Sequence, residues 1–435
     1  MRHPPAHVGV DFGTSNSAVA LFDGTGEVRF AEFSLFGRPT VSYRSLLFFD
    51  PDAQEVGAPI DYAAGTQGIE AYLDAMGEGR LIQSFKSHLT SAATGRTQIG
   101  PHHLDLDDLL MLFLRRLRSS AQRSLGFAPA YAVFGRPVHF VDAQDADDDA
   151  RAVRRLERAA IRAGFDEVRF ALEPLGAAYH YERRLQRPEL VLVADFGGGT
   201  TDFCLVRLGP ERREHTAREE DIVATGGIGI AGDDLDAAII EHVVAPALGK
   251  GSTYTSMGKD HTVPNSYYYK LSRWHLLSFL RGEKTRSELL RLSRLSHEPE
   301  AIERLIHVIE ANQGFHLHKA VEQLKVRLSS ADEAEFTYHD GPVDLRVRVT
   351  RRDFEAWIEP QVGQIERCLD ETLAAAGFVP AQIDRVFMTG GTAFVPAVRR
   401  RFEARFGADK LRSGDELVSI ASGLAVHAGQ RWRAA

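Results

Sequence analysis

Two short stretches of this chain repeat one pattern, and the repeat limits the folds that the chain can adopt. They are VGVDFGTSNSAVAL at residues 8–21 and LVLVADFGGGTTDFCLV at residues 190–206. In each stretch an apolar run ends in Asp-Phe-Gly, small polar residues and glycines follow, and a second apolar run begins. This pattern predicts a strand, a tight turn and a second strand. The simplest explanation is an α/β protein made by duplication, with one such unit at the start of each half.

The length of the chain predicts more than one compact body. Its 435 residues exceed what one hydrophobic core usually holds, and 44% of them are hydrophobic, as in ordinary globular proteins. We therefore expect two lobes around a cleft. Lobe I covers residues 1–187, lobe II covers residues 188–412, and a closing helix in residues 413–435 packs back on lobe I.

Charge and cysteine content exclude several classes of protein. The net charge of −8 gives no general electrostatic reason to bind nucleic acid or a membrane surface. The only cysteines, Cys204 and Cys368, lie far apart in the sequence, which is typical of a reducing compartment and offers no zinc ligand set. No signal peptide or run of roughly 18 apolar residues is present. We expect a cytoplasmic protein with no nucleic-acid and no membrane partner.

Hydrophobic periodicity predicts the other elements. Strands are expected at residues 45–50, 131–137 and 343–349, and helices at residues 105–120 and from the acid run at 145–149 to Gly164. The second of these helices should bury one apolar stripe, made of Ala150, Val153, Leu156, Ala160 and Ile161. Residues 233–330 are expected to be mainly helical and to contain an irregular inserted subdomain at 249–318. At residues 385–402, a strand, a Gly-Gly turn and a helix with Pro396 in its first turn are expected.

The two glycine turns suit a bound phosphate. Glycine allows backbone N–H groups to approach a ligand closely, because it has no Cβ and tolerates positive φ. Asp11 and Asp195 end the strands before the turns and would repel a phosphate unless a hard cation such as Mg²⁺ lay between them. The pattern therefore indicates a magnesium nucleotide held between two turns.

Other motifs are weaker. Residues 227–232, GIGIAG, match the dinucleotide pattern G-x-G-x-x-G and precede a helix-like run, but no acidic residue stands where one would bind a ribose. No P-loop sequence occurs. The pairs His102 and His103, and His316 and His318, lack the partners of a metal cluster and are interpreted as surface or packing residues.

Taken together, these motifs resemble the Hsp70 family of ATPases, which have the duplicated actin-like (ribonuclease H-like) fold. The resemblance is greatest to short YegD-type members that lack the peptide-binding domain. VGVDFGTSNSAVA resembles the first phosphate segment and VADFGGGTTDFCLV the second. ALEPLGAAYHYE at 171–182 resembles the first connecting segment, GIAGDDLD at 229–236 a phosphate-contacting helix entry, and MTGGTAFVPAVRR the adenosine segment.

The resemblance implies a set of site residues for ATP or ADP and Mg²⁺. The implied catalytic residues are Lys86, Glu173, Asp195, Thr200 and Asp202. Lys86 is the only lysine before Lys250, in a stretch where arginine is otherwise used. An ammonium is a point charge with rotatable donors and a guanidinium is a planar fork, so the two impose different geometries on a ligand. Mg²⁺ would be held by Asp11 and Asp195, largely through water. The implied phosphate ligands are Asp11, Gly13, Thr14, Ser15, Asn16, Gly197, Gly198, Gly199, Thr200, Thr201, Gly232 and Asp233. Those for adenosine are Glu322, Lys325, Gly390, Gly391, Thr392 and Phe394.

The chain also departs from the family pattern. Val326 and Phe394 stand where Hsp70 proteins usually have arginines around the adenine, which puts the nucleotide preference in question. The chain ends about where the linker to a peptide-binding domain would start, so we expect no peptide clamp of the usual kind. A stretch longer than the family's usual one, the insert at 249–318, is the expected contact for an unknown protein partner.

We therefore expect a slow ATPase that works as a chaperone-like conformational switch. Two alternatives share the fold: a filament-forming ATPase of the actin and MreB kind, and a small-molecule kinase. Filament-forming relatives commonly carry Glu where this chain has Asp202, and a kinase would need a substrate-pocket base that the sequence does not show.

Overall fold

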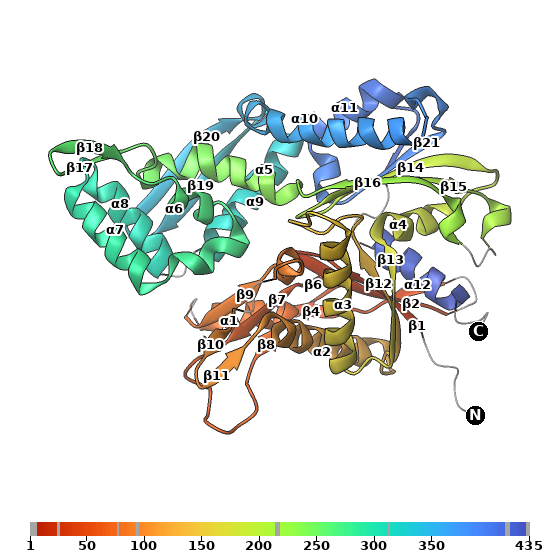
Figure 1. The fold of residues 1–435 in the computed structure, drawn as a ribbon, viewed down its shortest axis with the longest axis horizontal. Helices are drawn as coiled ribbons and strands as arrows, with labels where there is room; N and C mark the ends of the chain where they lie inside the picture. The colour runs from red at the N-terminus through yellow and green to blue at the C-terminus, as the bar shows by residue number, and fades with distance from the viewer. Residues whose placement is uncertain are drawn as a thin grey trace. The chain divides into compact units, whose positions relative to one another are not determined.

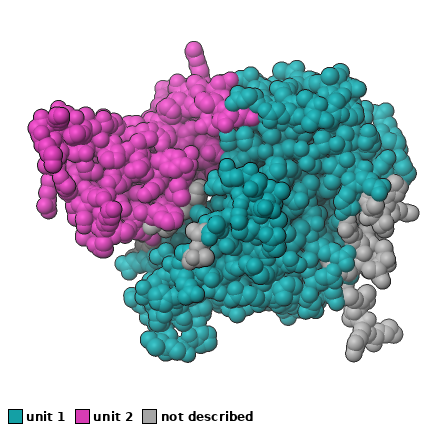
Figure 2. Space-filling view, viewed as in Figure 1, with its two compact units in different colours: residues 1–231, 365–393, 398–435 teal, residues 232–364, 394–397 magenta. Residues whose placement is uncertain are grey.

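The chain forms two compact units. The computed structural model describes residues 7–23, 27–75, 78–92, 95–213, 218–311, 314–413 and 418–431. Unit 1 is made of residues 1–231, 365–393 and 398–435, and unit 2 of residues 232–364 and 394–397 (Figure 2). Both glycine turns belong to unit 1. The expected lobe boundary between residues 187 and 188 therefore falls inside unit 1, and it stays a prediction.

Unit 1 contains two sheets with the same pairing pattern (Figure 1). The first has the order β13-β12-β1-β2-β3, with β1 (His7–Phe12), β2 (Asn16–Phe22), β3 (Val28–Phe30), β12 (Tyr131–Arg136) and β13 (Glu167–Leu172). The second has the order β16-β15-β14-β21-β22, with β14 (Glu189–Phe196), β15 (Thr201–Leu208), β16 (Ile222–Ile228), β21 (Arg385–Thr389) and β22 (Leu411–Ser413). In both, the first strand of the hairpin pairs antiparallel with the second and parallel with a strand from later in the chain. On one side a third strand pairs antiparallel with the second hairpin strand, and on the other side a further parallel strand extends the sheet. The expected duplication is confirmed.

The first sheet is covered on one face by α2 (Leu106–Leu125) and α3 (Ala146–Arg162). Each begins at an aspartate whose side chain accepts hydrogen bonds from the first turn, Asp105 for α2 and Asp145 for α3. The expected stripe of α3 is partly wrong. Leu156 and Ala160 are buried as expected, but Ile161 is 44% exposed and Ala152 and Ala159 are buried instead. The buried face of α3 is therefore shifted by about one residue from the predicted face. Alanines pack closely because they are small, and hydrophobicity alone does not indicate this.

Two helices, α4 (Glu173–Glu182) and α12 (Ser419–Arg431), pack against each other and against the sheets of unit 1. Their contact is made by bare backbone, since a Cβ on Gly423 would lie 1.7 Å from the Gly176 carbonyl oxygen. A Cβ on Gly9 of β1 would lie 2.2 Å from the Ala425 nitrogen of α12. Residues 415–417 of the expected closing helix lie outside the described residues. The glycines bring the helices close to the strand that ends at the first turn.

Smaller elements complete unit 1. They are β4 (Phe33–Leu35), β5 (Arg38–Thr40), β6 (Tyr43–Arg44), β7 (Leu46–Phe49), β8 (Ala63–Ala64), α1 (Gly65–Asp74), β9 (Arg80–Gln83), η1 (Phe85–His88), β10 (Thr97–Ile99) and β11 (His102–Leu104). The helix α11 (Pro396–Phe406) begins in unit 2 and continues in unit 1, and Pro396 is its first residue as expected.

Unit 2 combines helices with two hairpins. Its elements are α5 (Gly232–Ile239), β17 (Thr253–Ser256), β18 (Lys259–Thr262), α6 (Ser266–Leu271), α7 (Glu283–Leu295), α8 (Pro299–Glu310), α9 (Gly314–Ser330), β19 (Glu333–Asp340), β20 (Val343–Thr350) and the first part of α10 (Arg351–Ala375). The expected helical insert thus contains the hairpin β17–β18, which the sequence analysis missed. Its turn is Met257-Gly258 rather than a standard Asn-Gly signal.

Candidate active site

The first glycine turn is fixed by the segment that follows it. A Cβ on Gly13 would lie 2.2 Å from the Asn16 carbonyl oxygen, so no larger residue fits this turn. The Ser45 hydroxyl donates to the Gly13 carbonyl at 2.7 Å, and the Ser45 N–H donates to the Ser15 carbonyl at 3.0 Å. The Asn16 amide oxygen accepts from the Ser42 hydroxyl at 2.9 Å. These bonds hold the turn in one shape, in which the Gly13 and Ser15 carbonyls are already bonded.

The second glycine turn is held at its base in a similar way. The Gly197 N–H donates to the Thr200 carbonyl at 2.9 Å, and the Thr201 hydroxyl donates to the Ile230 carbonyl at 2.7 Å. Gly390 lies against this turn with φ of 84°, and a Cβ there would lie 2.0 Å from the Phe196 carbonyl oxygen. Only glycine suits that position, on grounds of both backbone angle and space. The Gly390-Gly391 segment therefore contacts the C-terminal end of β14, where the second glycine turn begins.

The two turns meet inside unit 1. A Cβ on Gly199 would lie 3.3 Å from the Thr14 hydroxyl and 3.9 Å from the Ser87 hydroxyl. The turn of the second sheet is therefore in van der Waals distance of the turn of the first sheet and of the residue that follows Lys86. Thr14 and Thr200 are both buried at this junction. Backbone N–H groups, hydroxyls and an ammonium are brought together there.

Lys86 is held in place by an ion pair. Its Nζ lies 2.5 Å from Glu173 Oε1, and both side chains are 7% exposed. Lys86 belongs to the short helix η1, which follows Ser84 in a left-handed conformation with φ of 59°. Phe85 beside it and Phe12 beside Asp11 both contact the ring of Phe113 on α2, each at 5.6 Å between centroids. The same helix thus anchors the lysine and the end of β1.

Four carboxylates surround this one ammonium. Burial raises the pKa of Asp11 to about 7, and the Glu173 carboxylate contributes to the shift. The pKa of Asp202 rises to about 7, first through burial and then through Glu173. Burial and the neighbouring carboxylates hold the pKa of Asp195 well above its usual range. Burial alone would lower the pKa of Lys86, but Glu173 and Asp11 raise it, so the lysine is charged. The site carries more negative than positive charge, which favours a bound cation.

The carboxylates do not form a direct metal cage. Among the described residues, no three His, Cys, Asp or Glu side chains are arranged to hold a metal ion. A cation at this site would therefore be bound by one or two carboxylates together with water, which is the usual coordination of Mg²⁺. Asp11 and Asp195, at the ends of β1 and β14, are the residues that fit this role.

Asp202 is oriented by neighbours that the sequence analysis did not identify. The Val138 N–H donates to Asp202 Oδ1 at 2.8 Å, and the Thr200 hydroxyl also bonds to this carboxylate. A Cβ on Gly227 of β16 would lie 2.7 Å from the same oxygen, so this position of the strand requires a residue without a side chain. The Val138 contact is a backbone contact, which leaves no signal of residue type.

Some of the expected phosphate and adenosine residues lie in unit 2. Lys325 Nζ is 2.8 Å from Asp236 Oδ2 and 3.3 Å from the Gly232 carbonyl oxygen. Burial would lower the pKa of Lys325, but Asp236 raises it. Burial, followed by the Asp236 carboxylate, raises the pKa of Asp233 to about 7. Asp236 was missed as a partner, although the spacing of acids in DDLD indicates that one of them faces inward.

The other expected adenosine residues are divided between the units. Thr392 is buried in unit 1, close to Gly390 in the chain. Glu322 is exposed in unit 2, where Val326 is 62% and Phe394 51% exposed. The predicted nucleotide residues therefore come from three turns of unit 1, at residues 13–16, 197–201 and 390–392, and from residues of unit 2 that include Glu322 and Lys325.

A duplicated sheet with two phosphate-type turns converging on a lysine and four carboxylates is the architecture of the actin-like ATPases. Comparison with protein families gives the particular family. The model described as "Hsp70 protein" matches residues 7–253 and 307–431 of this chain. The chain belongs to the Hsp70 family. Members of this family are ATPases that bind ATP or ADP with Mg²⁺, so an ATP-binding, chaperone-related function follows from membership.

The family match leaves out residues 254–306, which include most of the expected insert. The described helices include none that combines the length and the apolar composition needed to span a membrane.

Proposed function

We propose that this protein is a Mg²⁺-dependent ATPase that hydrolyses ATP to ADP and phosphate slowly and acts as a chaperone-like conformational switch. The observation that supports this most is the junction of Gly199 with Thr14 and Ser87, beside the Lys86–Glu173 pair. A fold of this family without catalysis would need neither a buried ammonium nor an excess of buried carboxylates at that point.

The two turns would bind the β- and γ-phosphates. The Gly13 and Ser15 carbonyls are bonded within the protein, and the N–H groups and hydroxyls of the turn are the donors that phosphate oxygens can use. In our proposal Thr14 and Ser15 bind from the first turn, and Gly197 to Thr200 bind from the second. Bound Mg²⁺ would supply positive charge to the phosphate oxygens, held through water by Asp11 and Asp195.

Catalysis would depend on position and charge, because phosphoryl transfer to water requires little covalent chemistry from the protein. Lys86, fixed by Glu173, would orient the attacking water with its ammonium. Asp202 would accept a hydrogen bond from that water and its proton, since a pKa of about 7 is close to the working pH. Thr200 would donate to the γ-phosphate.

The nucleotide state would reach the rest of unit 1 through the connecting helix. Glu173 pairs with Lys86 and is also the first residue of α4, which contacts α12 through bare glycine backbone. A shift of Lys86 with nucleotide would therefore act directly on α4. Any work on a client protein would be done by a partner that recognises the resulting conformation. We place this activity in the cytoplasm, in keeping with the two free cysteines.

The base of the nucleotide would be recognised less strongly than usual. Val326 and Phe394 are both largely exposed, and neither provides the charge of an arginine. Phe394 would stack on a base with little discrimination. We therefore propose that the protein prefers ATP over GTP only slightly.

Isothermal titration calorimetry with ATP, ADP and GTP, each with and without Mg²⁺, tests this function. We expect ATP and ADP to bind with Mg²⁺ and to lose most of their affinity without it, with GTP bound only slightly more weakly. Phosphate release from ATP should follow at a measurable rate without an added acceptor. Absence of nucleotide binding, or phosphate transfer only to an added small molecule, would contradict the proposal.

A further inference from the structure

Unit 2 carries a groove in the segment that the family match leaves out. The groove lies between the C-terminal half of α7 and the hairpin β17–β18, and its volume is about 630 Å³. The two elements lie beside each other in Figure 1. Every residue that lines the groove belongs to unit 2 and to residues 254–306, so the groove is separate from the nucleotide residues of the proposed function.

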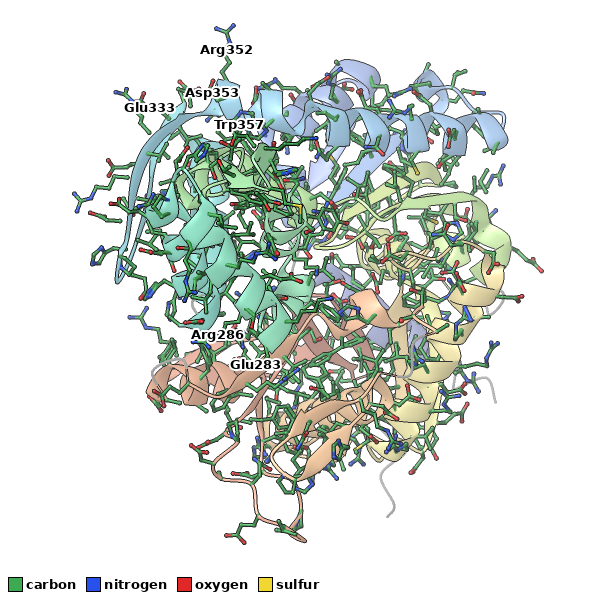
Figure 3. All side chains as sticks on the ribbon, turned by 60° about the vertical axis from the view of Figure 1, so that its left-hand side comes forward. Glu283, Arg286, Glu333, Arg352, Asp353 and Trp357 are labelled. Carbon is green, nitrogen blue, oxygen red and sulfur yellow. The ribbon has the colours of Figure 1, made fainter. Side chains whose placement is uncertain are left out.

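The helix α7 has two different faces. Leu289, Leu292 and Ser293 are buried, and Ser293 donates to Glu303 of α8 at 3.3 Å. Arg286, near the start of α7 in Figure 3, pairs with Glu310 of α8 at 2.6 Å. The other face lines the groove at helical spacing, with Ser287, Leu290, Arg291, Arg294 and Leu295. One face therefore holds α7 in the unit, and the other is available to a ligand.

The second wall of the groove is held rigidly against α7. The His297 N–H, just after α7, donates to the Thr253 carbonyl at 2.9 Å. The two ring nitrogens of His297 lie 3.0 Å from the Thr253 hydroxyl and 2.9 Å from the Thr255 hydroxyl. Tyr254 and Ser296 form an isolated β-bridge. The groove is thus formed before any ligand arrives, which lowers the entropic cost of binding.

The tip of the hairpin combines two unfavourable features. Met257 has φ of 50° and is 99% exposed, and Gly258 follows with φ of 73°. A two-residue turn with both φ values positive favours Asn-Gly, and a methionine costs roughly 1 kcal/mol there. The exposed Met257 side chain therefore adds no packing to unit 2. Strain and exposure together point to a contact made with another molecule.

The charge of the groove defines the kind of ligand. Arg291 and Arg294 are exposed, no acidic residue lines the groove, and neither arginine forms an ion pair within the described part of the chain. Arg294 lies in the last turn of α7, where a basic residue complements the helix dipole, but Arg291 lies nearly a turn earlier. Met257, Leu290 and Leu295 supply apolar surface in the same groove.

We propose that this groove is a docking site for an acidic segment of a partner protein. Two carboxylates of the segment would pair with Arg291 and Arg294, and an apolar side chain between them would pack on Met257, Leu290 and Leu295. Paired guanidinium groups suit carboxylates in bidentate geometry. Nucleic acid is disfavoured, because the groove contains no aromatic residue for base stacking and the chain has a net charge of −8.

Selection from a phage-displayed library of random 12-residue peptides, with the full 435-residue chain as the target, tests this proposal. We expect the enriched peptides to carry acidic residues around a large apolar residue. The synthetic consensus peptide, measured by fluorescence anisotropy, should bind the double variant Arg291→Glu/Arg294→Glu at least about tenfold more weakly. The matched control is Arg352→Glu on α10, an exposed arginine of unit 2 that points away from its helix in Figure 3. It should bind the peptide as wild type does.

A second variant separates binding from folding. Met257→Asn creates the favoured Asn-Gly turn, so it should raise the melting temperature while weakening the peptide several-fold. Phosphate release should be unchanged in all these variants, because none touches the nucleotide residues. The proposal is overturned if selection returns no peptide or peptides without acidic residues, or if the double variant binds the consensus peptide as tightly as wild type. Loss of binding to a 12-nucleotide RNA in the double variant, with no effect on the peptide, would assign the groove to nucleic acid instead.

Discussion

Replacing Lys86 by alanine gives the most direct test of the site. Lys86 Nζ and Glu173 Oε1 are 2.5 Å apart, with both side chains 7% exposed, so the substitution leaves a carboxylate buried among three others. Breaking a buried pair in this way typically costs about 3–5 kcal/mol of the free energy of unfolding. Loss of one preorganised charge should also lower turnover by a factor on the order of 10² to 10³.

The two effects can be separated by a second substitution. In Lys86→Ala/Glu173→Gln the carboxylate that loses its direct partner is also neutralised, so part of the lost free energy of unfolding should return, whereas turnover should stay low. Lys86→Arg retains the charge but replaces a point charge by a planar fork, so it should fold normally and turn over slowly. Phosphate release under single-turnover conditions, nucleotide affinity by calorimetry and unfolding in urea supply the three measurements.

Two results would refute this reasoning. Turnover of Lys86→Ala within about threefold of wild type would show that the lysine is structural only. Equal losses in nucleotide affinity and in turnover would show that Lys86 binds the nucleotide in its ground state and has no separate role in the reaction.

Three further predictions follow from the same geometry. Thr200→Val should weaken ATP binding roughly tenfold and ADP binding much less, and comparable losses in calorimetry would contradict a bond to the γ-phosphate. Asp11 and Asp202, with pKa values of about 7, hold protons at and below neutral pH. Binding of Mg²⁺ with ADP should therefore release about one proton or more at pH 7 and fewer as the pH rises, and heats of binding that are equal in phosphate and Tris buffers would refute this. Burial lowers the pKa of His427 to about 4 in the folded protein. As the pH falls below 6.5, this histidine therefore takes up a proton in the unfolded chain before it does so in the folded chain. The free energy of unfolding should drop by about 3 kcal/mol between pH 6.5 and 4 on this account, and urea unfolding of His427→Gln should show a correspondingly flatter pH profile.

The sequence predicts the fold well where the signal is local. A glycine turn between two apolar runs determines its own hairpin, and the repeat at Asp11 and Asp195 was enough to infer two equivalent sheets. The parallel strands β12 and β21 also follow from short runs next to a proline or a Gly-Gly turn. Elements of this kind depend on neighbouring residues, so one chain without an alignment suffices to find them.

Prediction was less successful where contacts join distant residues. The hairpin β17–β18 was missed because Met-Gly is a rare turn sequence, and the face of α3 was displaced because alanines pack without a hydrophobic signal. In the site, the roles of Val138 N–H and of Asp236 depend on backbone position and on a helix face. Lys86 was implied by the family resemblance and stood out because lysine is rare in that half of the chain, but its ion pair with Glu173 was not predicted.

The hydrogen bonds between Thr253 and His297 bring together the two ends of a stretch that lies within the segment left out of the family match. A loop whose ends already touch can be lengthened or removed with little change in the entropy of the surrounding chain. Changes of length at the exposed tip of the hairpin β17–β18 should therefore be tolerated, because the two ends of the stretch stay joined at its base. A segment closed at its base in this way can vary in length and sequence while the residues of the proposed nucleotide site keep their positions.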